Sequence, residues 1–218
     1  MKHSVYHKAL LAAGSLAMLS GQAAAALNFV RLGTIRDSGG SSYETRLASG
    51  GAAATGWADD SRGAQQGFHW DAATGIKGVG VLGTQTIGSL GYGISGNGSV
   101  AVGSSYTDAG ITAYRWTQAG GIVSLGDLAG GKVESAAYGA SLDGSVIVGY
   151  GTTSSTERAF KWTAGTGMTA LAMLSGNNYS RAYSVSDDGK TIVGVTGRGV
   201  GAETELQAVM WGPSGILG

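Results

Sequence analysis

The side chains of this sequence that could act as acids, bases or metal ligands are its carboxylates and its three histidines. His3 and His7 lie close to the N-terminus, and the rest of the chain holds only His69, between Phe68 and Trp70. The acids that fall near expected strand ends or loops are Glu44, Asp59, Asp60, Asp108, Glu134, Glu157, Glu203 and Glu205. A glycosidase needs two carboxyl groups about 5 to 9.5 Å apart, a separation that the sequence does not give.

Motifs for metals and cofactors are missing from the sequence. A single histidine after residue 26 and no cysteine in the chain exclude a histidine-rich or thiolate zinc site. Asp59-Asp60 and Asp187-Asp188 are paired acids, but neither pair has the interleaved spacing of a calcium loop. The glycine-rich stretches lack the motif of a phosphate-binding loop. We therefore predict no catalytic residue, no metal and no cofactor, and we expect that the protein is not an enzyme.

The composition limits which fold classes and which partners are possible. The 218 residues include 41 Gly, one Pro and no Cys, and 13% are charged. A hydrophobic content of 43% is enough for a core, and the single Pro213 excludes collagen. Lys plus Arg and Asp plus Glu both number 14, so no basic field exists to hold a phosphate backbone. Nucleic acid is therefore not expected as a partner.

The first 26 residues have the features of a secretory signal peptide. Lys2 and Lys8 precede a largely apolar run at 9–19, and small residues occupy 23–26. About 11 apolar residues are too few to cross roughly 30 Å of hydrocarbon as a helix. We therefore expect an exported protein without a membrane span in its mature chain, located outside the cell, at the cell surface or in the periplasm.

The rest of the chain, 27–218, repeats one unit about four times. A Trp closes an alternating run in each unit, at Trp70, Trp116, Trp162 and Trp211, with spacings of 46, 46 and 49. A Tyr-x-x-Ser block precedes three of them, at Tyr92, Tyr138 and Tyr183. Each block leads into a turn that contains Gly98, Gly144 or Gly189. Such a period is typical of repeat architectures.

Each unit fits four short antiparallel strands. In one unit we expect strands at 136–141, 145–150 and 158–163, with a fourth after Gly167, and a two-residue hairpin at Asp143-Gly144. Four strands in about 46 residues predict a blade of an all-β, propeller-like fold in which neighbouring blades cover each other's apolar faces. The small residues Gly93, Gly139 and Ser184 suit the crowded inner end of each wedge.

The two ends of the chain allow two interpretations of whether the units form a closed ring. The segment 28–35 matches the fourth-strand pattern but precedes the first unit, and the sequence stops at 215–218, where the last fourth strand begins. One hypothesis is that the N-terminal strand completes the last blade and closes a four-bladed ring. The alternative is a truncated array with an exposed edge strand.

Structural roles account for the residues that first suggest chemistry. His69 occupies the position of Arg115, Lys161 and Met210 in the other units, so we expect it to be an exposed residue on the outward face. Asp143 and Asp188 stand at corners matched by Asn97 and Gly50, so turn formation explains these acids.

At these repeated blocks the sequence resembles the HAF-repeat family of extracellular repeats, found in exported bacterial proteins and in autotransporter passengers. The blocks that carry the resemblance are 92–103, 125–131, 138–149, 158–163 and 183–194. The family has His-Ala-Phe before the Trp, and this chain replaces that His every time, with Gln66, Thr112, Arg158 and Gln207. No role of the family's His is therefore transferable. The resemblance implies display at the cell surface, with an outer-membrane partner as one means of anchoring.

We accordingly expect a non-enzymatic exported protein, adhesin-like or passenger-like, that binds an extracellular glycan or protein. The loops 104–111, 151–157 and 196–205 join second to third strands and are the expected contact sites. One alternative is a secreted hydrolase or lyase that acts on polysaccharide with carboxylates from neighbouring blades. Another is a fragment of a larger autotransporter without an activity of its own.

Overall fold

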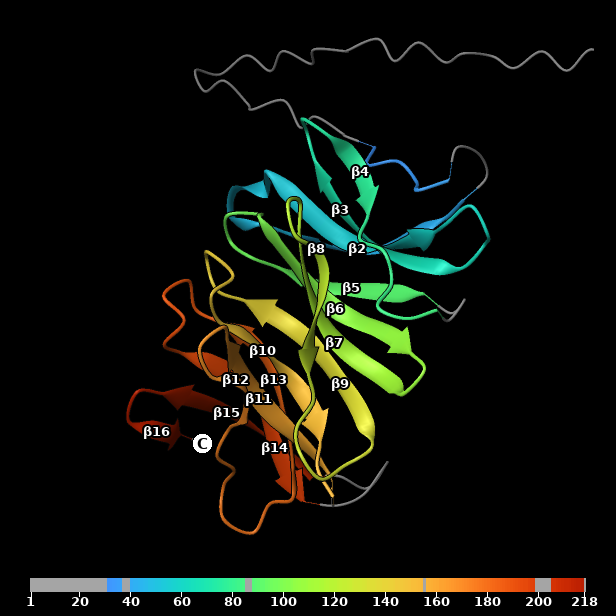
Figure 1. Cartoon of the computed structure of the whole chain (residues 1–218). Coiled ribbons are helices and arrows are strands. Elements are labelled where there is room, and N and C mark those ends of the chain that lie inside the picture. Colours follow the sequence, from blue (N-terminus) through green and yellow to red (C-terminus); the bar gives the residue numbers. More distant parts are fainter. Residues whose placement is uncertain (1–30, 37–39, 85–87, 155, 199–204, 218) are drawn as a thin grey trace, which may run out of the picture. The chain divides into compact units, whose positions relative to one another are not determined.

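The structure is a computed structural model that describes residues 31–36, 40–84, 88–154, 156–198 and 205–217 (Figure 1). The segment Leu32–Gly218 forms one compact unit. The predicted signal peptide, 1–26, lies outside the described residues, as do Glu203 and most of the expected loop 196–205.

The strands of the described residues form four groups of four along the chain, here called units 1 to 4. Unit 1 contains β1 (Ser42–Leu47), β2 (Ala53–Asp59), β3 (Gln65–Asp71) and β4 (Gly75–Gly78). Unit 2 contains β5 (Ser89–Ile94), β6 (Val100–Thr107), β7 (Gly110–Thr117) and β8 (Gly121–Gly126). Unit 3 contains β9 (Val133–Ala140), β10 (Ile147–Thr152), β11 (Glu157–Thr163) and β12 (Gly167–Ala170). Unit 4 contains β13 (Tyr179–Val185), β14 (Ile192–Arg198), β15 (Glu205–Gly212) and β16 (Gly215–Leu217).

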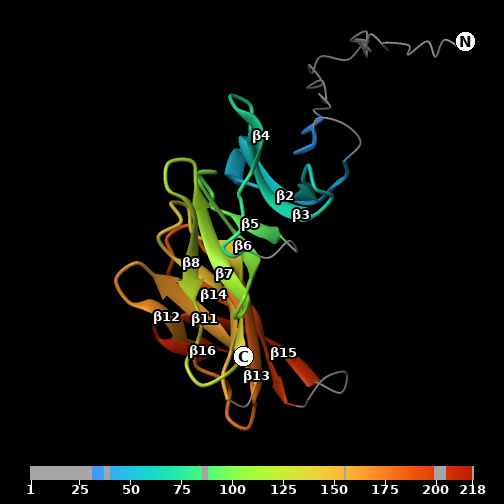
Figure 2. The same ribbon diagram turned by 45° about the vertical axis from the view of Figure 1, so that its right-hand side comes forward.

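Each unit is an antiparallel meander, so the predicted all-β fold is confirmed. A short parallel pairing between β7 and β9, at Gly110 with Val133 and Ile111 with Glu134, joins units 2 and 3 into one sheet. A single 3-10 turn, η1 (Ser49–Gly51), interrupts the strands of unit 1. Neighbouring units are in contact through β2 and β3 with β5, through β6 with β9, and through β10 and β11 with β13 (Figures 1 and 2).

The apolar clusters lie between units. One cluster joins Val102 and Ala113 of unit 2 to Ile147 and Phe160 of unit 3. The other interfaces contain Val79 with Tyr114 and Trp116, and Val148 with Ile192 and Trp211. Burying one large aromatic side chain is worth roughly 4 to 6 kcal/mol as an upper bound. A unit alone would expose these side chains, so stacking holds the units together.

The turn between the first two strands differs from the predicted two-residue hairpin. In unit 3 the Ser141 N–H donates to the Val146 carbonyl over 2.9 Å, which leaves four residues in the loop. The Asp143 carboxylate accepts the Ser145 N–H over 2.9 Å and the Ser141 hydroxyl over 3.0 Å. Gly144 has φ +70, a conformation that L side chains disfavour. The longer loop forms because the Ser141 and Asp143 side chains bind turn N–H groups.

Glycines of the first strands let neighbouring units approach closely at the inner end, as the sequence predicts. A Cβ added at Gly93 would clash with the Tyr138 carbonyl oxygen, and one at Gly139 would lie 3.0 Å from the Tyr183 carbonyl oxygen. Ser184 holds the equivalent place in unit 4, because it pairs with Val193 as Gly139 pairs with Val148.

Unit 4 contains its own fourth strand. β16 pairs with β15 through Leu217 with Met210 and Ile216 with Trp211. The described residues 31–36 form no strand, and Ile35 lies beside Gly78 of β4. The hypothesis that the N-terminal segment completes the last blade is therefore not met by the described residues, in which no strand pairing joins unit 1 to unit 4.

Candidate functional site

A strip of aromatic rings runs across the first and second strands of all four units. We call Tyr43, Trp57, Tyr92, Tyr138, Tyr150 and Tyr183 the aromatic strip. Its successive ring centroids are 6.4 Å apart for Tyr43 and Trp57, 6.3 Å for Trp57 and Tyr92, 5.4 Å for Tyr92 and Tyr138, and 5.7 Å for Tyr138 and Tyr183. Tyr43 and Tyr183, at the two ends, are 48% and 44% exposed, the rings of Trp57, Tyr92 and Tyr138 between them are half-buried, and Tyr150 is buried.

The repeat itself places these rings. Tyr92, Tyr138 and Tyr183 lie where the pairing register of β5, β9 and β13 shifts. Each directly precedes the inner-end residue of its strand, which is Gly93, Gly139 or Ser184. Trp57 and Tyr150 each follow a Gly in the second strand, at equivalent register positions of β2 and β10. Three repeated tyrosines on adjacent first strands must therefore line up.

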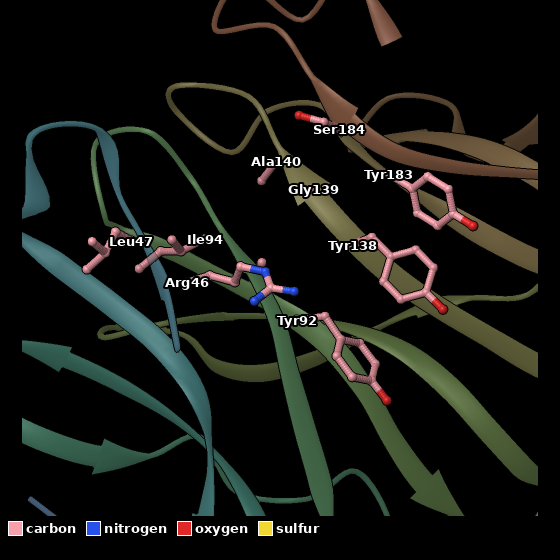
Figure 3. Close-up of a pocket in the computed structure, with 10 residues that line it drawn as sticks. Arg46, Leu47, Tyr92, Ile94, Tyr138, Gly139, Ala140, Tyr183 and Ser184 are labelled. Atoms are coloured by element: carbon pink, nitrogen blue, oxygen red, sulfur yellow. The ribbon is translucent and has the colours of Figure 1, made fainter. Parts of the chain in front are cut away.

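A pocket of about 260 Å³ lies against the strip, lined by the first strands of all four units (Figure 3). Tyr92, Tyr138 and Tyr183 form one side, with their hydroxyls turned the same way. Arg46 of β1 points its guanidinium toward these rings. Strand pairing places Arg46 at the register position of Gly93 in unit 2 and Gly139 in unit 3. Unit 1 therefore has a long side chain where units 2 and 3 have none.

An ion pair borders the strip on the side of units 3 and 4. Arg181 donates to both carboxylate oxygens of Glu157, through Nε over 2.5 Å and through Nη2 over 2.9 Å. Its guanidinium lies 4.3 Å from the ring centre of Tyr150 and 5.6 Å from that of Tyr179. Burial lowers the pKa of Arg181, but the hydrogen bonds and charge of Glu157 outweigh it and raise the pKa overall. The pair fixes the rings rather than offering a free charge.

Tyr138, Tyr150 and Tyr179 keep their protons at physiological pH. Burial raises the pKa of Tyr138 to about 12 and that of Tyr179 to about 12. Burial also raises the pKa of Tyr150 above its ordinary value. These hydroxyls are therefore neutral groups that can donate or accept hydrogen bonds.

The prediction that His69 is exposed is wrong. His69 is 5% exposed, its Nε2 lies 2.8 Å from the Gly98 carbonyl oxygen, and its ring centroid is 5.0 Å from that of Trp116. The outward face of unit 1 is the face that unit 2 covers, which explains the burial. Arg115 lies in the same way 6.0 Å from the Trp162 ring of the next unit. His69 is thus part of the contact between units 1 and 2.

Most of the candidate acids have local partners in the structure. Asp60 accepts hydrogen bonds from Arg62, Asp59 from the Ser41 N–H, Asp108 from Thr84, and Glu134 pairs with Lys132. Asp188 repeats the turn role of Asp143, because it accepts the Ser186 hydroxyl over 2.6 Å. Glu205 begins β15 and is exposed, and no side-chain geometry is described for Glu44. In the described part of the chain, no group of three or more His, Cys, Asp or Glu side chains could hold a metal ion.

Sequence reasoning missed Asp127 and the full extent of the strip. Asp127 lies after β8 and accepts the Leu128 and Glu134 N–H groups over 2.9 and 3.0 Å. Burial raises its pKa even though these hydrogen bonds lower it. The expected contact loop at 104–111 is mostly strand, because β6 and β7 continue to a turn at 108–109.

Most of the repeated tryptophans and turn glycines lie where units meet. Trp116 and Trp211 are buried, with 6% and 4% exposure, and Trp70 and Trp162 are half-buried. The Trp211 indole N–H donates to the Ala172 carbonyl of unit 3 over 2.7 Å. Gly98, Gly144 and Gly189 all have positive φ and face the preceding unit.

Comparison with known proteins identifies fold neighbours alone. No family model matches the chain, and no curated protein matches it. Solved structures do match: TolB from Acinetobacter baumannii has a TM-score of 0.54 at 13% identity over 81% of this chain. In fold, the chain is similar to TolB. The protein assigned as TolB from Agrobacterium tumefaciens has a TM-score of 0.56 at 12% identity over 78% of this chain. The chain spans 43% and 62% of those two chains, and the likeness supports a β-propeller-like fold.

No helix in the described residues is long and apolar enough to cross a membrane. The resemblance to the HAF-repeat family stays a prediction.

Proposed function

We propose that this chain is an exported, non-enzymatic binding protein that holds an extracellular glycan along the aromatic strip. The observation that carries the proposal is the row of rings on neighbouring strands, exposed at both ends and half-buried between them, with centroids 5.4 to 6.4 Å apart. Aromatic faces offer a large, rigid contact area to a ring-shaped ligand at low entropic cost.

The charges around the strip favour a neutral or weakly charged ligand. Glu157 and Arg181 neutralise each other, and Glu134 is paired with Lys132. The tyrosine hydroxyls and the Arg46 guanidinium supply hydrogen bonds for hydroxyl groups. A polysaccharide segment, which combines apolar ring faces with many hydroxyls, satisfies both requirements.

The aromatic strip is also compatible with a second candidate function, that of a hydrolase or lyase acting on polysaccharide. An aromatic platform is one of the two features such an enzyme needs, and a pair of free carboxyls is the other. Glu134 and Glu157 are engaged in ion pairs, and Asp127 is held by backbone N–H groups. Binding therefore accounts for the site better than hydrolysis.

Export agrees with the leader predicted at 1–26 and with the extracellular repeats that the sequence resembles. In this proposal the protein works at the cell surface as an adhesin or passenger-like module.

A glycan array combined with whole-cell binding tests the function. Tyr183→Ala, at the exposed end of the strip, is expected to weaken binding about fivefold or more, because one stacked aromatic contributes about 1 to 3 kcal/mol. Val123→Ala is the matched control, since Val123 is 46% exposed on β8 outside the strip. Equal binding by both variants would contradict the proposal, and release of shortened sugars would establish the hydrolase instead.

A further inference from the structure

Unit 4 exposes a face that the other units bury. Val193 is 44% exposed, while Val102 and Val148, at the same register position, are fully buried under the next unit. Met210 and Leu217 on the same face are 39% and 58% exposed. These side chains line a shallow hollow of about 440 Å³. We call this surface the tail face.

Buried serines connect each unit to the one before it. Ser89 accepts the Gly67 N–H over 3.1 Å, Ser135 the Ala113 N–H over 2.9 Å, and Ser180 the Ala159 N–H over 2.9 Å. All three serines are fully buried. Strand pairing makes Ala208 the unit 4 counterpart of Ala113 and Ala159, and Ser42 the unit 1 counterpart of the serines. Ala208 and Ser42 are both exposed.

Turn glycines make a second connection that repeats in the same order. A Cβ on Gly98 would lie 2.7 Å from Ala53, and one on Gly189 would lie 2.6 Å from Val146. Gly144 would clash with Val100 in the same way. The unit 1 counterpart is Gly51, which shares the positive φ at +73 and the hydrogen bond to the residue three before it, yet has nothing within 4 Å in the described structure. The Val100 and Val146 counterpart in unit 4 is Thr191, since each accepts the N–H that opens its turn.

We propose that the tail face binds unit 1 of a second copy of this chain, as unit 3 binds unit 4. Ser42 and Gly51 of one copy would meet the Ala208 N–H and Thr191 of the other. Met210 would cover Trp70 of the second copy, as His69 covers Trp116 within one chain. Because the two surfaces differ, the contact is head-to-tail and joins copies into a ring or a filament.

One residue of unit 1 departs from the pattern and limits the strength of this contact. Glu44 comes two residues after Ser42, as Gly91, Ala137 and Ala182 come two residues after the serines of the other units. In the other units this position is buried and holds a small residue. A carboxylate brought into such an interface loses hydration, which disfavours association. We expect Glu44→Ala to tighten self-association about tenfold.

The test is the mass of the purified full chain over a range of concentrations, by sedimentation velocity and mass photometry. The wild-type chain is expected to exceed the mass of one copy as concentration rises, and Glu44→Ala is expected to do so at lower concentration. Ala208→Glu blocks the tail face, and Ser42→Lys blocks unit 1, so each alone should remain monomeric. Gln118→Glu, in the exposed turn after β7, is the control for added charge and should associate like wild type.

A mixture of the two blocked variants separates a head-to-tail contact from general aggregation. Ala208→Glu and Ser42→Lys bring opposite charges together in one interface and leave the other interface native, so the mixture should associate again. The proposal is overturned by a wild-type chain that stays monomeric, by blocked variants that associate like wild type, or by a mixture that stays monomeric. Thermal melts of each variant check that the fold is retained.

Discussion

Replacing Gly144 with Ala measures how much the stacking of units contributes to stability. Gly144 has φ +70, and an added Cβ would clash with Val100 of unit 2. Positive φ costs a non-glycine residue about 1 to 2 kcal/mol. Overpacking a tight contact costs about 1 to 3 kcal/mol more. We therefore expect Gly144→Ala to lower the free energy of unfolding by about 2 to 5 kcal/mol.

The chain provides a matched control for this experiment. Gly51 has nearly the same conformation, φ +73, in the equivalent turn of unit 1, but nothing within 4 Å in the described structure. Gly51→Ala should therefore cost only the backbone part, about 1 to 2 kcal/mol. The difference between the two variants, about 1 to 3 kcal/mol, isolates the contact between units.

Urea unfolding at low protein concentration gives both values, and low concentration keeps the association proposed above from contributing. Thermal melting gives a second measure, because 1 kcal/mol corresponds to about 2 to 4 °C in a domain of this size. In a Val100→Ala background Gly144→Ala should cost less than in the wild type, since two of the three Val100 atoms that meet the added Cβ are then absent. Equal destabilisation by Gly51→Ala and Gly144→Ala would refute the claim that the turn glycine is required by the neighbouring unit.

Two further predictions follow from buried polar groups. Ser135→Ala leaves the Ala113 N–H without its partner, so urea unfolding should show a loss of about 1 to 3 kcal/mol, whereas the exposed Ser42→Ala should cost less than about 0.5 kcal/mol. Because folding raises the pKa of Tyr138 to about 12 from an ordinary value of 10.0, its contribution to stability is present below pH 10 and is lost as the pH rises from 10 through 12. Tyr138→Phe should make the alkaline decline shallower in a series of melts, and an unchanged decline would contradict the assigned shift.

The repeat made the strands predictable to within about three residues: the strand expected at 136–141 is β9 at Val133–Ala140, and the one expected at 145–150 is β10 at Ile147–Thr152. The expected strand at 158–163 is β11 at Glu157–Thr163, and the expected fourth strand after Gly167 is β12. These strands could be predicted because the alternation of apolar residues, the turn glycines and the repeat period indicate the same strand boundaries. The turn at Asp143 was harder to predict, because the dipeptide Asp143-Gly144 fits both a two-residue hairpin and a longer loop closed by side-chain hydrogen bonds.

His69 shows what the pattern of one strand cannot give. Its alternation with Phe68 and Trp70 places it on the opposite face of β3, and in a lone sheet that face would meet water. In a stack, the next unit covers it. A clue was present in the paired strands, since Val102 and Val148 are apolar at the positions that pair with Arg115 and Lys161. Two apolar faces on one unit indicate that both are covered.

The aromatic strip was only partly predictable for a related reason. The three repeated tyrosines were visible in the sequence, but Trp57 and Tyr150 belong to other strands and do not repeat in every unit. Their proximity depends on how closely the units approach at the inner end, which is a property of packing. Trp57 and Tyr150 each follow a Gly of the second strand, and this was the available signal.

The arrangement of the aromatic strip depends on glycines of the first strands, and the stability of the stack depends on the turn glycines. Gly93 and Gly139 allow the first strands of units 2, 3 and 4 to approach, and that approach sets the 5.4 and 5.7 Å between the rings of Tyr92, Tyr138 and Tyr183. A side chain at Gly93 would push the Tyr138 backbone away and open a gap in the strip. Such a variant would lose affinity for an extended ligand even where it remains folded, whereas Gly144→Ala, at a turn rather than beside the rings, would reduce stability first. The two glycines thus separate the arrangement of the strip from the stacking that supports it.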